Sequence, residues 1–309
     1  MFKITLKNKF LRYLFSKFIL IFALIFLINP TLYALGQDTQ EADQQINNFS
    51  LSGYGEKHKK AWDISGDSAD IFDNIIKLKN VIGNLYGEKE DIKLTADKGD
   101  FDKVDGKIHL EQNVVITTSG GAKLTTNSLD WDRKKQLVAT NDIVNIAREN
   151  MVTVAKGAIG EPNLKKVTLQ KDVQVDINPA AEENKGKAGK NKIIITCDGP
   201  LEIDYAKNIA TFKNNVKVDT QDNLIYSDIM DVYFATSGDD KKETDDAPMM
   251  MGTKIEKIVA RGNVKITRGE NVSYSEEAVY SAVDKKIVLT GKPKLIIYST
   301  EGLSASFGN

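Results

Sequence analysis

Apolar and polar residues alternate with a period of two along most of the chain. In one clear stretch the apolar positions are Ile108, Leu110, Val114 and Ile116, and most residues between them are polar. This period is typical of a β-strand with one buried face and one face in water. Antiparallel sheets tolerate that arrangement best. Because no helical pattern longer than a turn or two follows Gly36, the sequence predicts an all-β protein.

The alternating segment recurs about every thirty residues. Each copy has an apolar residue, three spacer residues, a small aliphatic residue and then further alternation. The spacing becomes regular once two polar insertions, residues 179–191 and 237–253, are set aside. Such a repeat indicates stacked units that share one apolar core. The aliphatic positions that mark the register are Val81, Val114, Ile143, Val173, Val216, Val264 and Pro293.

The residues just before these marks favour turns or bulges, as in Gln112-Asn113, Asn214-Asn215 and Gly262-Asn263. Residues separated from a mark by an even number of positions are predicted to form one continuous inward face. Its predicted lining residues are Leu110, Val114, Ile116, Leu169, Val173, Val175, Phe212, Val216, Val218, Val264, Ile266, Leu289 and Leu295.

A second short element lies between the marks, and it includes the single cysteine, Cys197. By its place in the repeat, Cys197 is predicted to point inward, as Ala96, Thr126 and Tyr226 are in other units. A small buried hydrophobic side chain is the role expected for it.

The first 36 residues carry five basic and no acidic side chains. An apolar run at 18–28 follows, and Asn29-Pro30 then breaks it. Residues 1–36 therefore have the form of an export signal that is cleaved after Gly36. An uncleaved membrane-anchor helix is the alternative, although Arg12 and Lys17 interrupt the roughly 20 apolar residues that a span needs. Either interpretation places the rest of the chain outside the cytoplasm.

Composition argues against several function classes. The net charge of −1 gives no basic patch for nucleic acid, and one cysteine excludes a disulfide framework or a cysteine-built zinc site. His58 and His109 leave little material for acid–base catalysis. The acidic run at 239–246 lacks the spacing of a calcium loop. We therefore expect no enzyme activity, no metal and no cofactor.

Several short motifs resemble the lipopolysaccharide export bridge family. Residues 62–69, 94–102 and 121–132 are similar to its inner-membrane-associated subunit, LptC. Residues 210–218, 260–264 and 288–291 are similar to its soluble bridge subunit, LptA, with the OstA-like domain. We accordingly expect an LptC-like unit at 46–178, a linker at 179–191 and an LptA-like unit at 192–309.

The resemblance implies a twisted, half-open antiparallel β-jellyroll, or β-taco, whose interior holds lipid acyl chains. It also implies a periplasmic protein at or near the inner membrane, with lipopolysaccharide and an inner-membrane ABC transporter complex as partners. The chain has no phosphate-binding loop of its own. A chain of about 12 carbons costs on the order of 10 kcal/mol to hold in water, so an apolar groove removes the main barrier to moving such a lipid.

The repeat also predicts an incomplete end. A full unit runs from Val264 to Lys292, and only 17 residues remain from Pro293 onward. The last unit therefore stops about halfway and leaves an unpaired strand edge, which is a template for another strand. We expect head-to-tail joining to further bridge or outer-membrane components. The predicted contact residues are Leu295, Ile297, Leu303 and Ala305.

Two other classes compete with lipid transfer. An extracytoplasmic scaffold or adhesin would have the same repeat around a closed core filled by its own side chains. A carbohydrate-processing enzyme on a stacked β fold would need carboxylates clustered in a cleft, whereas the acids here sit mainly at polar positions of strands or in turns. The sequence leaves open whether the two halves form one groove or two.

Overall fold

The computed structural model describes residues 42–54, 59–87, 91–132, 134–161, 164–178, 192–235, 255–284 and 286–298. All regular elements in these residues are strands. The strands are β1 (Gln44–Tyr54), β2 (Lys60–Ile71), β3 (Ile75–Leu85), β4 (Ile92–Asp102), β5 (Lys107–Thr118), β6 (Lys123–Asp132), β7 (Leu137–Arg148), β8 (Met151–Glu161), β9 (Lys166–Ile177), β10 (Ile193–Cys197), β11 (Leu201–Asp204), β12 (Ile209–Asp219), β13 (Asn223–Phe234), β14 (Ile255–Arg268), β15 (Asn271–Ser281), β16 (Lys286–Thr290) and β17 (Lys294–Ile296).

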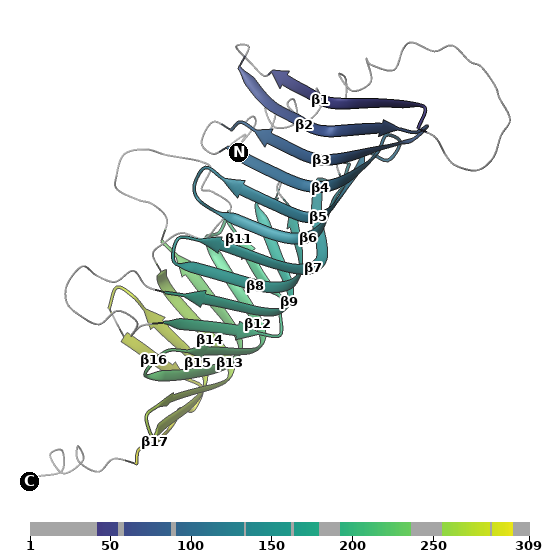
Figure 1. Ribbon diagram of the computed structural model, residues 1–309. Helices are drawn as coiled ribbons and strands as arrows, with labels where there is room; N and C mark the ends of the chain where they lie inside the picture. Colours follow the sequence, from purple (N-terminus) through teal and green to yellow (C-terminus); the bar gives the residue numbers. More distant parts are fainter. Residues whose placement is uncertain are drawn as a thin grey trace, which may run out of the picture.

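The strands form one antiparallel sheet in which successive strands of the chain pair with each other, except that β10 does not pair with β11, nor β16 with β17. Figure 1 shows them stacked in chain order, from β1 at one end of the molecule to β17 at the other, with the sheet twisting along the stack. The two halves of the chain are joined within this sheet, because β9 pairs with both β10 and β11. The all-β, antiparallel prediction is confirmed.

Most strands are bent near their middle. At two places the bend interrupts the strand, so that its two segments carry separate labels. β10 and β11 both pair with β9 and β12, so they are two segments of one folded strand. β16 and β17 both pair with β15 in the same way. We call the side of the sheet that includes β10 and β17 arm A, and the side that includes β11 and β16 arm B.

The bends occur at the turn-forming positions expected from the sequence. Gln112, Asn113, Asn214, Asn215 and Asn263 all have positive φ angles of 49–64°. The strand register shifts at the same places, for example between Glu111 and Val114 of β5. Asparagine tolerates this left-handed conformation better than most residues. The predicted bulges are therefore present, and each one turns its strand from one arm into the other.

Asparagine side chains at the bends also form hydrogen bonds to the neighbouring strand. Asn113 Nδ2 donates to Asp97 Oδ2 at 2.6 Å, and Asn80 Nδ2 donates to Asp67 Oδ2 at the same distance. Asn263 Nδ2 makes the equivalent bond to Asp228 at 2.9 Å in the second half. These hydrogen bonds join adjacent strands along the outside of the bend.

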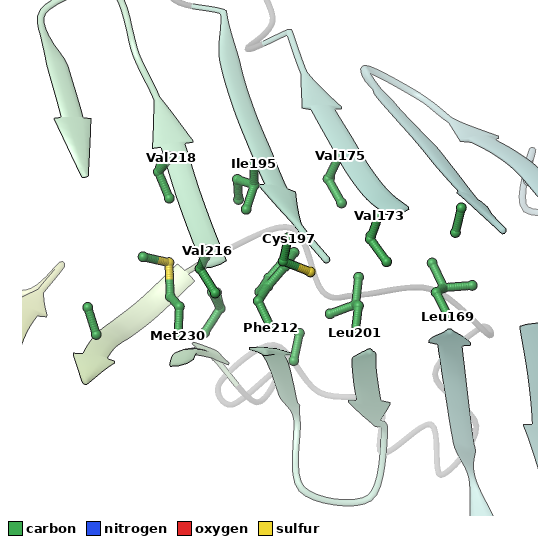
Figure 2. Close-up of a cluster of buried hydrophobic side chains, with 14 of the residues drawn as sticks. Leu169, Val173, Val175, Ile195, Cys197, Leu201, Phe212, Val216, Val218 and Met230 are labelled. Carbon is green, nitrogen blue, oxygen red and sulfur yellow. The ribbon is translucent and has the colours of Figure 1, made fainter. Parts of the chain in front are cut away.

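The two arms face each other across a layer of apolar side chains. Figure 2 shows Val175, Ile195 and Val218 from arm A pointing toward Leu169 and Leu201 from arm B. These residues belong to one buried cluster that extends from Ala155 to Ala278. In the first half the core is two smaller clusters, one around Ile76 and Val81 and one around Leu110 and Val114.

Two details of the predicted register are wrong. The mark Ile143 is 60% exposed, whereas its neighbour Val144 is fully buried. Tyr226 is 37% exposed and points outward, and Ser227 takes the inward position instead, opposite Val216. In β7 a register shift between Thr140 and Ile143 decides which of the two adjacent apolar residues points inward. In β13 the pairing of Tyr226 with Lys217 and Lys265 places the tyrosine on the outward face. Pro293 lies in the turn between β16 and β17.

The predicted signal or anchor at 1–36, the linker at 179–191 and the insertion at 237–253 lie outside the described residues. Within the described residues no helix is long and apolar enough to cross a membrane.

Candidate functional site: the inward apolar face

The pairing of the strands aligns apolar side chains into rows that cross the whole sheet. On arm A, one inward row, which we call row A, continues through every folded strand because each member pairs with the next. Its members are Leu51, Ile64, Gly83, Leu94, Ile116, Leu124, Ile146, Thr153, Val175, Ile195, Val218, Ile225, Ile266, Ser273 and Leu295. With neighbouring strands about 4.8 Å apart, the row is roughly 70 Å long.

Arm B carries two inward rows of the same kind. The row nearer the bend contains large side chains in the second half of the sheet, where Leu169, Leu201, Phe212 and Met230 pair in succession. The second row, which we call row B, lies farther from the bend. Its members are Ile71, Ile76, Phe101, Ile108, Trp131, Val138, Gly160, Val167, Ile203, Ala210, Val232, Ile258, Tyr280 and Ile287.

All the predicted lining residues lie on this inward face, but at different depths. Nine are buried, and three, Ile116, Ile266 and Leu289, are partly exposed. The last one, Leu295, is 62% exposed at the end of the sheet. The buried set is Leu110, Val114, Leu169, Val173, Val175, Phe212, Val216, Val218 and Val264.

The buried and half-buried positions are arranged in layers. The valines next to the bend, such as Val114 and Val264, have at most 1% of their surface exposed, so the protein's own side chains already fill the base of the fold. Farther from the bend, Ile116 and Ile266 of row A and Ile258 of row B remain partly exposed. An apolar guest molecule would therefore contact the partly exposed members of rows A and B; other members, such as Val175 and Ala210, are fully buried.

Rows A and B contain no charged side chain at the positions given above. At the base of the fold, Cys197 is 4% exposed, and burial raises the pKa of its thiol. This confirms Cys197 as a buried side chain. The hydroxyls of Ser227 and Ser275, also near the bend, are buried without a hydrogen-bond partner in the structure. Charge is kept off the inward face, as binding of an alkyl chain requires.

The outward face carries the charged residues, often as cross-strand pairs. Lys213 Nζ lies 2.8 Å from Glu202 Oε1, and His109 Nδ1 lies 2.7 Å from Asp130 Oδ1. Asp231 is buried on this face and accepts hydrogen bonds from Arg261 and from the Thr211 hydroxyl. No group of three or more potential metal ligands occurs among the residues that the structure describes.

The sheet ends with exposed apolar residues. β16 and β17 pair with β15 on one side, and no strand in the described part of the chain pairs with their other side. Ile287, Leu295 and Ile297 are each more than half exposed there. Of the predicted edge contacts, Leu303 and Ala305 lie outside the described residues.

The fold defines the class of this protein. It is a long, open antiparallel sheet that is folded along its length around an uncharged apolar face. Residues 17–178 match the sequence model of the LptC family, described as "Lipopolysaccharide-assembly, LptC-related". Residues 199–306 match a second model, "LptA/(LptD N-terminal domain) LPS transport protein". Since the first match alone spans more than half of the 309 residues, the chain belongs to the LptC-related lipopolysaccharide-assembly family. The predicted LptC-like first half and LptA-like second half are both confirmed.

One similar solved structure is the crystal structure of LptH, "the LptA homologous periplasmic component of the conserved lipopolysaccharide transport device from Pseudomonas aeruginosa". It is 12% identical over 67% of this chain and 95% of that chain, with a TM-score of 0.17. At that TM-score the two molecules do not superpose as whole bodies, so the family assignment depends on the sequence models alone. None of the curated proteins matches the chain.

Proposed function

We propose that this protein is a non-enzymatic, periplasmic bridge component that carries lipopolysaccharide from the inner to the outer membrane. In this proposal acyl chains lie in an apolar trough lined by rows A and B, while the sugars stay in water. The observation that carries the proposal is the continuity of row A, which crosses the junction between the LptC-like and LptA-like halves without a break.

The energetics of a continuous row suit transfer rather than storage. Each buried methylene contributes about 0.8 kcal/mol, so a chain of about 12 carbons gains on the order of 10 kcal/mol in an apolar site. Because twelve of the fifteen members of row A are leucine, isoleucine or valine, a lipid can move between most neighbouring positions without a large change in free energy. Net movement then requires energy from a partner, which we propose is an ATP-driven transporter in the inner membrane.

The two ends of the sheet suit head-to-tail assembly. β1 and the β16–β17 pair each leave one strand edge without a partner in the described chain, and such an edge can accept a strand from another molecule. We propose that the C-terminal edge joins the next bridge component. Deletion of residues 293–309 should abolish the association in a pull-down assay, and undiminished association would contradict this part of the proposal.

Site-specific photo-crosslinking in cells tests the trough itself. A photoreactive residue at Ile116 or Ile266, both inward and partly exposed, should capture lipopolysaccharide. The matched controls are Val115 and Thr267, which are adjacent in the sequence but point outward, and these should not capture it. Equal capture at inward and outward positions, or no capture at either inward position, would contradict the proposal.

One observation favours a second candidate, a scaffold with a closed core. From Ala155 to Ala278 the two arms contact each other through a single buried cluster. If Ile116 captures lipid and Ile266 does not, the second half serves as a structural connector and the trough is limited to the first half.

A further inference from the structure

The outward face of the second half carries a strip of alternating lysine and tyrosine side chains. The strip consists of five residues, each paired with the next across neighbouring strands. Its members, in order from β12 to β17, are Lys217, Tyr226, Lys265, Tyr274 and Lys294. We call this set the Lys/Tyr strip.

The strip is confined to one end of the sheet. The same outward row continues through the preceding strands, from β1 to β10, where every residue is uncharged and none is aromatic. Those residues are Ser50, Ser65, Ile82, Thr95, Val115, Thr125, Asn145, Val154, Gln174 and Thr196. General requirements of the sheet therefore do not explain why lysine and tyrosine alternate only from β12 onward.

Contacts within the strip place cations beside aromatic rings. The Lys265 ammonium lies 5.9 Å from the centre of the Tyr226 ring and 6.0 Å from that of Tyr274, within the range of a cation–π interaction. Both rings remain accessible, at 37% and 41% exposure. Lys292 and Asn263 extend the polar surface, and a hollow of about 440 Å³ lies among these residues. A ligand could therefore contact an exposed ring and an ammonium group together.

The nearby carboxylates either already form a hydrogen bond or an ion pair, or lie beside the strip rather than in it. Asp228 accepts a hydrogen bond from Asn263, and Asp219 pairs with Lys217 at 3.0 Å. The Glu276 side chain lies beside Gly291, which lines the hollow. Among the residues that the structure describes, none forms an ion pair with the Lys265 ammonium, so an anion at this position would meet a cation and two rings.

We propose that the Lys/Tyr strip binds a linear anionic glycan that carries one carboxylate or phosphate on every second sugar. The lysines are two strands apart, which places them about 10 Å from one another. A β-linked disaccharide repeat has a similar length, so successive charges can meet successive lysines. The sugars between the charges then lie against the tyrosine rings, whose apolar faces suit the C–H faces of a pyranose. This binding surface is on the opposite face of the sheet from the proposed lipid trough.

Other polyanions fit less well. DNA carries one negative charge per about 1.7 Å of helix axis, far denser than the lysines. The chain after Gly36 also has 37 basic and 43 acidic residues, which disfavours approach of a highly charged polymer. An acidic polypeptide could match the charge spacing but has no ring faces to place against the tyrosines.

Titration calorimetry on the full exported chain tests the proposal. The probes are a hyaluronan octasaccharide, which has one carboxylate per disaccharide, the neutral chitin octasaccharide, and a polyglutamate of equal charge. We expect the hyaluronan probe to bind at least roughly tenfold more tightly than the neutral chitin probe, since one charge-assisted contact is worth about that factor. It should also bind more tightly than polyglutamate, because only the sugar rings can pack against the tyrosines. Lys265→Gln and the double variant Tyr226→Ser, Tyr274→Ser should each weaken its binding about tenfold.

The matched control uses a Lys–Tyr pair on the same two strands but outside the strip. Lys257 lies 4.3 Å from the centre of the Tyr233 ring, directly across from it. Lys257→Gln and Tyr233→Ser should leave hyaluronan binding unchanged. No hyaluronan binding, or binding that survives loss of the strip residues, would overturn the proposal. Equal or tighter binding of polyglutamate would overturn it in favour of an acidic protein partner.

Discussion

Replacement of Gly199 by alanine should destabilise the fold far more than the same replacement at Gly106. Both glycines have positive φ angles, of 97° and 67° respectively. A Cβ at Gly106 would meet no atom within 4 Å, whereas at Gly199 it would lie 2.3 Å from the backbone carbonyl oxygen of Gln170 on β9. The pair therefore separates the cost of the backbone conformation from the cost of close packing between strands.

The magnitude follows from these two contributions. A non-glycine residue in the left-handed region costs about 1–2 kcal/mol, and this applies at both sites. The overlap at Gly199 is with backbone, which cannot rotate away, so β9 and the bend between β10 and β11 must separate. Forced shifts of this kind cost typically about 1–3 kcal/mol more. We expect Gly199→Ala to lose roughly 2–5 kcal/mol and Gly106→Ala roughly 1–2 kcal/mol.

Urea unfolding of the purified protein, followed by far-UV circular dichroism, measures both values. Equal losses for the two variants would refute the reasoning, because they would show that β9 does not pack tightly on this bend. The bend at Gly199 is where the LptC-like half continues into the LptA-like half. The result therefore also reports on whether the two halves form one sheet in solution.

Three other measurements probe the interior. Phe212→Ala should lower the free energy of unfolding by about 3–5 kcal/mol, because the ring is 1% exposed. The control Val283→Ala, at 82% exposure, should change it by less than about 0.5 kcal/mol. Similar losses for the two variants would mean that the cluster is not packed. Burial raises the pKa of the Tyr205 phenol, so its contribution to stability is complete below pH of about 10 and is lost as the pH rises toward the higher folded-state pKa. Chemical unfolding should therefore show a smaller alkaline loss for Tyr205→Phe than for the native chain, and identical losses would contradict this. The Cys197 thiol, 4% exposed and with its pKa raised by burial, should react with a maleimide only after unfolding; rapid labelling of the folded chain would show that the base of the fold is open.

The period-two pattern predicted the inward face well where one apolar residue stood alone. Val114, Val216 and Val264 each follow a turn-forming pair and are buried as expected. The pattern failed at Ile143-Val144, where two adjacent apolar residues compete and only the bend geometry decides between them. It failed again at Tyr226, which pairs with Lys217 and Lys265 on the outward face, while Ser227 lies opposite Val216 and points inward instead.

The Lys/Tyr strip could not be predicted from the sequence, for a different reason. Tyr226 and Tyr274 are 48 positions apart, and Lys265 comes between them in the chain without any local signal. Their alignment depends on the register of four strand pairings. One hint is visible in the sequence, since both tyrosines occupy the same place in the short element between successive marks.

Native mass spectrometry of the protein, purified without denaturant from the cells that make it, tests the central claim most directly. The account predicts that an acylated glycolipid co-purifies with the chain and is lost from the double variant Ile116→Asp, Ile266→Asp. Both side chains are partly exposed on the inward face, so the double variant should still fold, which circular dichroism checks. A folded native chain that carries no lipid, or a variant that retains as much lipid as the native chain, would contradict the account.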